Sequence, residues 1–354
     1  MTSILTWPIY TLADAYTPRP PLQFCVDGIF MQPSVNVVYG APGSLKSMLM
    51  ADACVCVALG EIWLPSLLDT SQGILTTQTT GLWIDFDNGK RRTDERFDAI
   101  GKAYGADQAT ALFYVSMPTP WLDLTRMEMV SDLITMVRGV NAGFVVIDNL
   151  GVVSGDRDEN TTEMIQVMGN LRLIAERTNA SITVIHHQRK MQGKSDGRRQ
   201  GDALRGHSSI EASLDLALQV EREVNSDVIS VRATKARGAD VRPFGAMFTY
   251  DQVPGTKELA RVRFWGTEPV EDASDAAIED EIIDAINDAA AGYLTQTEIV
   301  KAVQAAIEGV GRGRIRSVLA KMEARGEVKS APSKGRTRAL HYTIPQPAQH
   351  GMPF

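Results

Sequence analysis

The chain is poor in cysteine and in aromatic residues. It contains three cysteines, and aromatic residues make up 6% of its 354 positions. Three cysteines cannot build a disulfide framework, and their spacing relative to the histidines matches no zinc site. We therefore expect Cys25, Cys54 and Cys56 to be small buried residues in a reducing cytoplasm.

The sequence also lacks a long apolar run. No stretch approaches the ~18–20 apolar residues that a transmembrane helix needs. The first ten residues, MTSILTWPIY, have no basic segment ahead of an apolar run, which a secretory signal peptide requires. The sequence thus predicts a cytoplasmic location and no membrane partner.

Basic residues are unevenly distributed. The formal net charge of the chain is −7, which taken as one number argues against a nucleic-acid-binding protein. Residues 301–354, however, hold ten basic and three acidic residues, so this segment carries +7 and the remainder −14. An acidic body with a basic C-terminal segment is compatible with nucleic-acid binding at the basic end.

Apolar strand-like runs alternate with segments that have helical character. We expect strands at 35–40, 81–87, 143–150, 180–187, 214–220 and 228–234, and helices at 46–59, 92–105 and 161–178. This alternation predicts an α/β fold whose sheet is mainly parallel and flanked by helices. We expect an irregular proline-rich lead-in over 1–33, the α/β domain over 34–268, a small α+β domain over 269–345 and a flexible tail over 346–354.

The strongest motif directly follows the first expected strand. It has the pattern of a phosphate-binding P-loop, in which a tight turn aims backbone N–H groups at phosphate and a Lys-Ser pair opens the next helix. Its residues are Gly40, Ala41, Pro42, Gly43, Ser44, Leu45, Lys46 and Ser47. Lys46 would contact the β- and γ-phosphates, and Ser47 would bind Mg²⁺. Leu45 replaces the last glycine of the pattern, whose backbone shape is costly for a residue with a Cβ.

A second acidic signal follows about 100 residues later. Asp148 ends the apolar strand FVVID, the Walker B arrangement, in which an acid supports Mg²⁺ across the sheet from Ser47. Together the two motifs predict an ATP-binding site with Mg²⁺.

Five segments in order resemble the RecA-like ATPases, especially the RepA-type hexameric plasmid helicases and their phage relatives. They are GAPGSLKS, LWIDFDNGKRR, FVVIDNL, ITVIHHQRK and ATKARG. The resemblance implies a RecA-like P-loop core, ATP hydrolysis and assembly into a ring, expected to be a hexamer. It also implies an acid that polarises the attacking water, for which Asp87 is the candidate and Asp85 the alternative. Of the adjacent His186 and His187, it favours His187 as the residue facing the nucleotide.

The resemblance further implies residues that act on DNA and on a neighbouring subunit. Residues 188–204 would form the loop that grips single-stranded DNA in the ring channel, through Arg189, Lys190, Lys194, Arg198 and Arg199. Lys235 and Arg237 would enter the ATP site of the next subunit, as a Lys-x-Arg element does in RecA-like hexamers. Arg205 is a second candidate for a nucleotide-sensing role.

The C-terminal segment resembles a winged helix-turn-helix domain. Its recognition helix would span residues 313–325, with Arg312, Arg314 and Arg316 at its start. A wing at 333–338 would present Lys334, Arg336 and Arg338 to phosphates. The resemblance implies duplex DNA binding, and we expect the acidic helix that precedes it to lie on the side away from DNA.

These observations favour a Mg-ATP-dependent DNA motor, a ring helicase for plasmid, phage or mobile-element replication. One alternative is an ATP-switched DNA-binding regulator or loader that acts through the winged helix, which Leu45 and Asp87 favour because both could slow hydrolysis. Another is a RecA-like strand-annealing or recombination ATPase.

Overall fold

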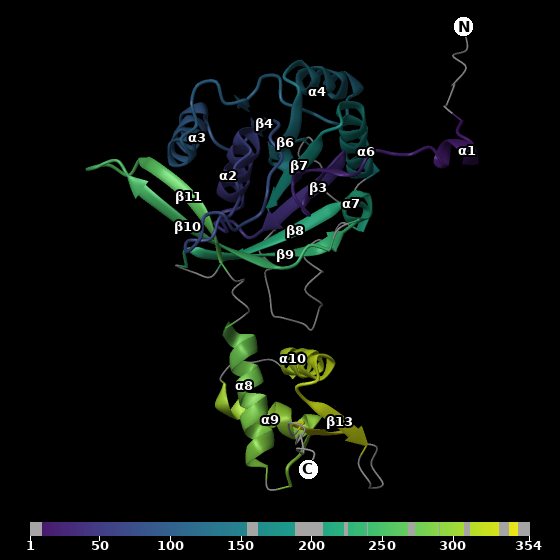
Figure 1. The fold of residues 1–354 in the computed structure, drawn as a ribbon, viewed down its shortest axis with the longest axis vertical. Coiled ribbons are helices and arrows are strands. Elements are labelled where there is room, and N and C mark those ends of the chain that lie inside the picture. The colour runs from purple at the N-terminus through teal and green to yellow at the C-terminus, as the bar shows by residue number, and fades with distance from the viewer. Residues whose placement is uncertain are drawn as a thin grey trace, which may run out of the picture. The chain divides into compact units, whose positions relative to one another are not determined.

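The computed structural model describes residues 9–153, 162–187, 208–222, 226–238, 240–267, 273–289, 291–307, 312–332 and 340–345. The chain divides into two compact units with the border between Thr267 and Glu268. The larger unit holds the central sheet and its helices, and the smaller one holds the C-terminal helices (Figure 1).

A nine-stranded sheet organises the larger unit. Six strands are parallel, in the order β8 (Leu216–Arg222), β3 (Ser34–Gly40), β7 (Ser181–His187), β6 (Ala142–Asp148), β4 (Thr80–Asp85) and β5 (Leu112–Ser116). Next to β8, three antiparallel strands extend the sheet: β9 (Val228–Ala236), β10 (Phe244–Gln252) and β11 (Leu259–Thr267). The α/β fold with a mainly parallel sheet is therefore confirmed, and it is a RecA-like P-loop core.

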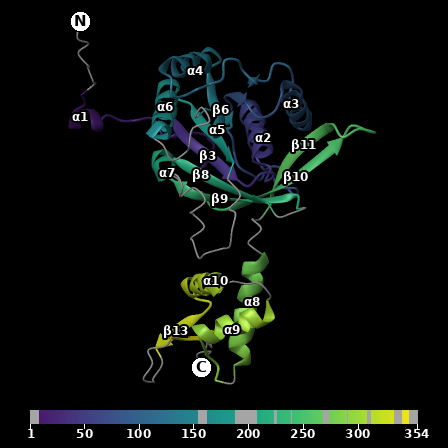
Figure 2. The ribbon, with the colours of Figure 1, turned by 180° about the vertical axis from the view of Figure 1, so that it is seen from behind.

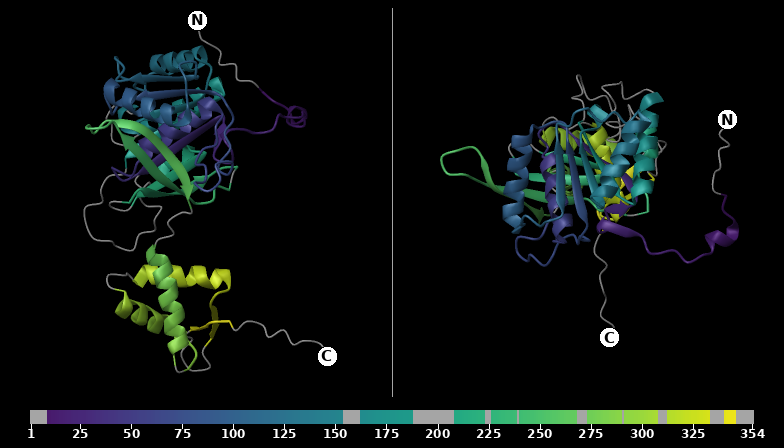
Figure 3. Two further views of the ribbon diagram at one scale, coloured as in Figure 1. Left: turned by 60° about the vertical axis from the view of Figure 1, so that its left-hand side comes forward. Right: turned by 90° about the horizontal axis from the view of Figure 1, so that it is seen from above.

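Helices cover both faces of this sheet, as the view from above in Figure 3 shows. On one face lie α2 (Lys46–Leu59) and α3 (Lys90–Tyr104), which share a core with Trp83, Phe144 and Val146. On the other face lie α4 (Met127–Gly139), α5 (Leu150–Val153), α6 (Thr162–Thr178) and α7 (Ser208–Ser213), seen from behind in Figure 2. The apolar character of α2 all round is explained by its burial between the sheet and α3.

The expected irregular lead-in was wrong for residues 23–32. After the short helix α1 (Leu12–Ala15), strands β1 (Gln23–Val26) and β2 (Phe30–Gln32) form an antiparallel hairpin. Its turn contains Gly28 with a φ of 66°, and Cys25, Val26 and Phe30 are buried in the core of the larger unit. The prolines flank this hairpin rather than interrupt it, so they do not prevent strand pairing.

Several elements of the larger unit were not predicted. The edge strand β5 and helix α4 fill the stretch between β4 and β6, and β10 and β11 form a hairpin after β9. The β10–β11 hairpin reaches α3, where Arg91 pairs with Glu258 and the Leu259 amide donates to Glu95. Contacts between segments so far apart in the chain leave no local periodic signal, so the sequence did not indicate these contacts.

The smaller unit contains α8 (Ala273–Asp288), α9 (Gln296–Ala306) and α10 (Arg312–Arg325). A three-stranded sheet accompanies them, in the order β12 (Leu294–Thr295), β14 (Leu340–Thr343) and β13 (Lys329–Pro332). Its core is formed by aliphatic residues of all three helices with Val328 and Tyr342. The helices and strands of this unit agree with the small α+β domain expected over 269–345, although β12 was not predicted. The expected tail at 346–354 lies outside the described residues. Within the part of the chain that the structure describes, no helix has the length and apolarity to cross a bilayer.

Candidate nucleotide site and nucleic-acid surfaces

The P-loop connects β3 to α2 at the carboxyl edge of the parallel strands. Gly40 must be glycine, because a Cβ there would lie 2.2 Å from the Val220 carbonyl oxygen. Gly43 has a φ of 82°, and Leu45 caps α2 with a φ of 64° in the left-handed region. Leu45 thus adopts the backbone shape that the missing glycine would supply, which costs a residue with a Cβ about 1–2 kcal/mol.

Lys46 is held inside this loop. Its Nζ donates to the carbonyl oxygens of Gly40 (3.0 Å) and Ala41 (2.9 Å) and to the Ser44 hydroxyl (3.2 Å). Burial lowers the pKa of Lys46 to about 8, and the charge of Asp148 partly opposes this shift. The residue is therefore positioned under the loop and retains its positive charge at neutral pH, as phosphate binding requires.

Asp148 ends β6 and is fully buried. Burial raises the pKa of its carboxyl to about 6, and the neighbouring Ser47 hydroxyl and Arg96 charge oppose the rise. Neither carboxylate oxygen has a hydrogen-bond partner among the described residues. A buried carboxylate without a partner is costly, so this pair of oxygens is suited to a bound cation.

Asp85 and Asp87, which the sequence left as alternatives, have different environments. Asp85 is buried and accepts hydrogen bonds from the backbone amides of Asp87 (2.9 Å) and Asn88 (2.8 Å) and from the Thr93 hydroxyl (2.8 Å). Its carboxylate therefore fixes the turn after β4. The Asp87 side chain is half exposed on that turn and lies beside His187, and its role as the water-polarising acid stays a prediction.

Asp87, Asp148 and His187 come together from three different strand ends. One ligand atom of each lies within 4.8 Å of the others, and His187 Nε2 is 3.9 Å from the Asp87 carboxylate. Burial lowers the pKa of His187, with a further contribution from the Lys46 charge. Oxygen ligands such as the free Asp148 carboxylate and the Ser47 hydroxyl fit Mg²⁺, which prefers carboxylate and hydroxyl oxygens together with water.

Arg96 is a residue of this site that the sequence analysis missed. It lies on α3, its guanidinium carbon is 5.8 Å from the centre of the Trp83 ring, and its charge acts on Asp148. Its Nη1 is buried without a hydrogen-bond partner among the described residues. The available signal was an arginine between the buried Thr93 and Phe97 on an amphipathic helix, where a cation is unexpected.

The site can be compared with known families now that its geometry is established. The family described as "AAA domain" matches residues 8–193, more than half of the chain. The chain belongs to this AAA domain family of P-loop ATPases. The match covers the P-loop, Asp87, Asp148 and His187, so nucleotide binding and ATPase activity are properties of the family. No curated protein matches the chain.

In this AAA domain protein, Lys235 and Arg237 lie near the amino-terminal ends of the parallel strands, whereas the P-loop lies at their carboxyl ends. Ala236 pairs with Leu216, which is next to Asn36 at the beginning of β3. The distance from Asn36 to Gly40 along a strand is about 13 Å. Lys235 and Arg237 are therefore remote from the chain's own P-loop, and their expected action at a neighbouring subunit stays a prediction.

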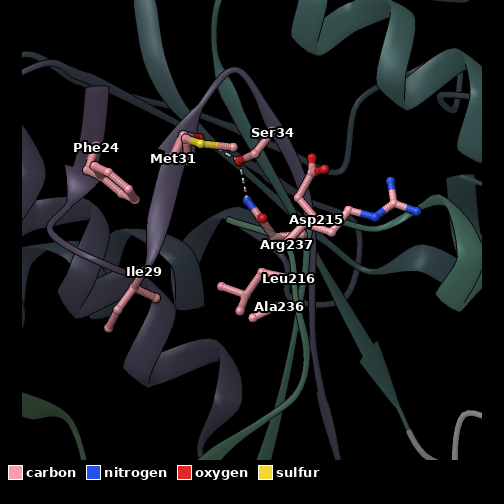
Figure 4. A pocket seen from close by; sticks show the side chains of 9 residues that line it. Phe24, Ile29, Met31, Ser34, Asp215, Leu216, Ala236 and Arg237 are labelled. Atoms are coloured by element: carbon pink, nitrogen blue, oxygen red, sulfur yellow. Dashed lines mark hydrogen bonds between the residues drawn. The ribbon is translucent and has the colours of Figure 1, made fainter. Parts of the chain in front are cut away.

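The Arg237 guanidinium makes a local contact. It donates to the Ala212 carbonyl at 2.5 Å, and Figure 4 shows it directed away from the apolar side chains of a small cavity of about 10 Å³. Asp215 at the same cavity pairs with Arg172 at 2.6 Å and accepts from the Val35 amide at 2.8 Å. These contacts join β3, α6 and β8 at this edge and have a structural role.

The acidic helix α8 of the C-terminal unit forms ion pairs with the basic helix α10, and the expectation that α8 lies on the side away from DNA stays a prediction. Asp275 of α8 pairs with Arg314 at 3.0 Å and Lys321 at 2.9 Å, and Glu279 pairs with Arg325 at 2.8 Å. Apolar residues on both helices bring α8 against α10, so its acids reach the basic side chains of α10.

Arg314 is thus partly neutralised by Asp275, although its side chain is exposed, as those of Arg312 and Arg316 also are. The other predicted nucleic-acid and sensing residues lie outside the described residues. They are Arg189, Lys190, Lys194, Arg198, Arg199, Arg205, Lys334, Arg336 and Arg338.

Proposed function

We propose that this AAA domain protein is a Mg-ATP-dependent RecA-like DNA motor, a RepA-type ring helicase for plasmid, phage or mobile-element replication. The observation that carries the proposal is the convergence of Lys46, Asp148, Asp87 and His187 at the carboxyl edge of the parallel strands. This set contains a lysine that binds phosphate, a carboxylate that holds the metal ion, a second carboxylate that polarises the attacking water and a histidine that senses the phosphate. Phosphoryl transfer requires these groups in one place.

Each residue has a distinct role in hydrolysis. Lys46 and the backbone amides of the P-loop bind the phosphates. Ser47 and Asp148 would hold Mg²⁺, which when bound neutralises phosphate charge. Asp87 accepts a proton from the attacking water and aligns it, because it is the carboxylate that the turn after β4 leaves available.

The DNA part of the proposal is supported by chain order and by charge. His187 is the last residue of β7, and the basic segment 188–204 follows it directly, so a change at the γ-phosphate can be passed to that segment. The remote position of Lys235 and Arg237 from the chain's own P-loop is compatible with the proposed action at a neighbouring subunit's ATP site. A homo-hexamer would provide such neighbours.

The test measures ATPase rate with and without single-stranded DNA, together with the oligomer mass in ATP. We expect DNA to stimulate wild-type hydrolysis and Lys46→Ala to abolish it. Lys90→Ala is the matched control, because Lys90 is an exposed lysine that pairs with Asp94 on α3. A wild-type rate that single-stranded DNA does not change would refute the motor function.

Strand displacement distinguishes the motor from an ATP-switched regulator. The motor predicts ATP-dependent unwinding of a forked duplex by wild type and none by Lys46→Ala. If neither protein unwinds but ATP changes duplex binding, the regulator is correct. The pairing of Arg314 with Asp275 disfavours the regulator, because part of the basic surface of α10 is engaged within the unit.

A further inference from the structure

Arg222 lies beside the P-loop on a strand that the sequence analysis did not connect with the nucleotide. It is the last residue of β8, whose backbone abuts the loop because the Val220 carbonyl occupies the space beside Gly40. The Arg222 Nη1 donates to the Gly43 carbonyl at 3.4 Å. The family match ends at residue 193, so it does not include this arginine.

Two further contacts fix the direction of this side chain. Its Nε donates to the Ser226 carbonyl at 2.5 Å, and its Nη2 is 3.5 Å from an oxygen of the Asp227 carboxylate. The side chain is 25% exposed. The guanidinium is therefore held by Ser226 and Asp227 through its Nε and Nη2, and its Nη1 donates to the P-loop.

A hydrogen bond to the Gly43 carbonyl has a geometric consequence for the loop. The peptide bond between Gly43 and Ser44 is planar, so its carbonyl and its N–H point in opposite directions. The Ser44 N–H on one side of this peptide donates across the turn to the Ala41 carbonyl oxygen at 3.2 Å, and the Gly43 carbonyl on the other side accepts from Arg222. Arg222 therefore holds from outside the same peptide that the Ala41–Ser44 turn holds from inside. A P-loop binds phosphate through backbone N–H groups, whose directions the loop conformation sets.

The loop also has a reason to need external support. Leu45 adopts a left-handed backbone with a φ of 64°, a conformation that a residue with a Cβ disfavours. Ser44, which follows Gly43, connects directly to this strained Leu45. A contact that stabilises the loop from outside offsets part of this cost before nucleotide binds.

We propose that Arg222 is a positioning residue that holds the P-loop in its phosphate-binding conformation. By stabilising the loop, Arg222 supports binding of the β-phosphate, which ADP and ATP share. This support is the same before and during hydrolysis. Loss of Arg222 should therefore weaken the binding of both nucleotides and leave the turnover of bound ATP unchanged. This inference rests on nucleotide binding and does not require the proposed action on DNA.

The experiment compares Arg222→Gln with Arg232→Gln. Arg232 is a control from the adjacent strand, with a similar exposure of 30% and an ion pair to Glu221 at 2.8 Å, and its guanidinium also bonds Gln219. Dissociation constants for Mg-ADP and Mg-ATP would be measured by calorimetry, and kcat at saturating ATP without DNA. For Arg222→Gln we expect affinity for both nucleotides to fall about 3–10-fold with kcat within about twofold of wild type, while Arg232→Gln binds as wild type does.

Three results would overturn the proposal. They are unchanged affinity in Arg222→Gln, an equal loss of affinity in both variants, and a fall of more than about twofold in kcat at saturating ATP in Arg222→Gln. If Arg222→Gln fails to fold, Asp227→Asn provides the second variant, because it removes an anchor of the guanidinium without removing the arginine. It should weaken ADP binding by about 2–3-fold, and unchanged binding in that variant would equally refute the proposal. A wild-type protein that binds ADP but shows no DNA stimulation would refute the motor function and leave this test intact.

Discussion

At position 45 a glycine variant should be more stable than an alanine variant, which is the reverse of the usual order. The substitutions Leu45→Ala and Leu45→Gly remove the same packing of a partly buried side chain against the core of the larger unit. They differ in the backbone, because the alanine variant would keep the strain at a φ of 64° and the glycine variant would not. The loss of packing therefore cancels when the stabilities of the two variants are compared.

The magnitude follows from two opposing contributions. A left-handed backbone costs alanine about 1–2 kcal/mol, and glycine loses about 0.4–1 kcal/mol through the greater freedom of its unfolded chain. We therefore expect Leu45→Gly to be more stable than Leu45→Ala by about 1 kcal/mol. For a domain of this size that corresponds to about 2–4 °C in the melting temperature.

The assay is thermal and urea denaturation without nucleotide, with Met48 as the matched position. Met48 also packs partly buried against the same core, but it lies within the first turns of α2 with ordinary helical backbone. There Met48→Gly should be less stable than Met48→Ala by about 1 kcal/mol. If Leu45→Ala equals or exceeds Leu45→Gly in stability, Leu45 is not strained and the reasoning about the loop is wrong.

Three further predictions concern charged groups. Burial raises the pKa of Asp52 to about 7, and the Tyr104 hydroxyl donates a hydrogen bond to its carboxyl group. The contribution of protonated Asp52 to folding stability is therefore fully present below its unfolded pKa of 3.8 and is lost as pH rises through about 7. In Asp52→Asn, the decrease in the free energy of unfolding with rising pH should be smaller by up to about 4 kcal/mol, measured by urea unfolding between pH 4.5 and 8. A pH profile of stability that matches wild type would contradict this prediction. Because the pKa of Asp148 is raised to about 6, Mg²⁺-dependent ATP binding should decline as pH falls through 6, and Asp148→Asn should bind ATP with no Mg²⁺ dependence; titrations at pH 5 and 7.5 decide this. Asp275→Asn should free Arg314 and Lys321, cost less than about 1 kcal/mol of stability and strengthen duplex DNA binding in a salt-dependent way, whereas unchanged binding at low salt would show that α10 does not contact DNA.

The local elements of the nucleotide site could be predicted because each has a short-range signal. The β3 strand and α2 were placed almost to the residue, since a buried strand ends at Gly40 and the helix begins at Lys46. Asp148 was identified from the apolar strand before it. Leu45 was recognised as a departure, and its left-handed backbone is the shape the motif requires.

The choice between Asp85 and Asp87 depended on packing. Both acids follow the same strand, two residues apart, and the sequence treats them alike. Only the fold shows that Asp85 accepts the amides of its own turn and the Thr93 hydroxyl, while Asp87 is left facing His187. The acidic helix α8 illustrates the same limit, because the sequence showed its charge but not its ion pairs with α10.

The sequence by itself determined the kind of chemistry, because the P-loop and the strand-end acids are encoded within a few consecutive residues. The tertiary structure decided which side chains meet. Arg96 and Arg222 approach the site from α3 and β8, and Arg237 lies on the far edge of the sheet, through strand pairing between residues far apart in the chain. Strand order and register are set by the burial of whole faces, which no short segment specifies alone.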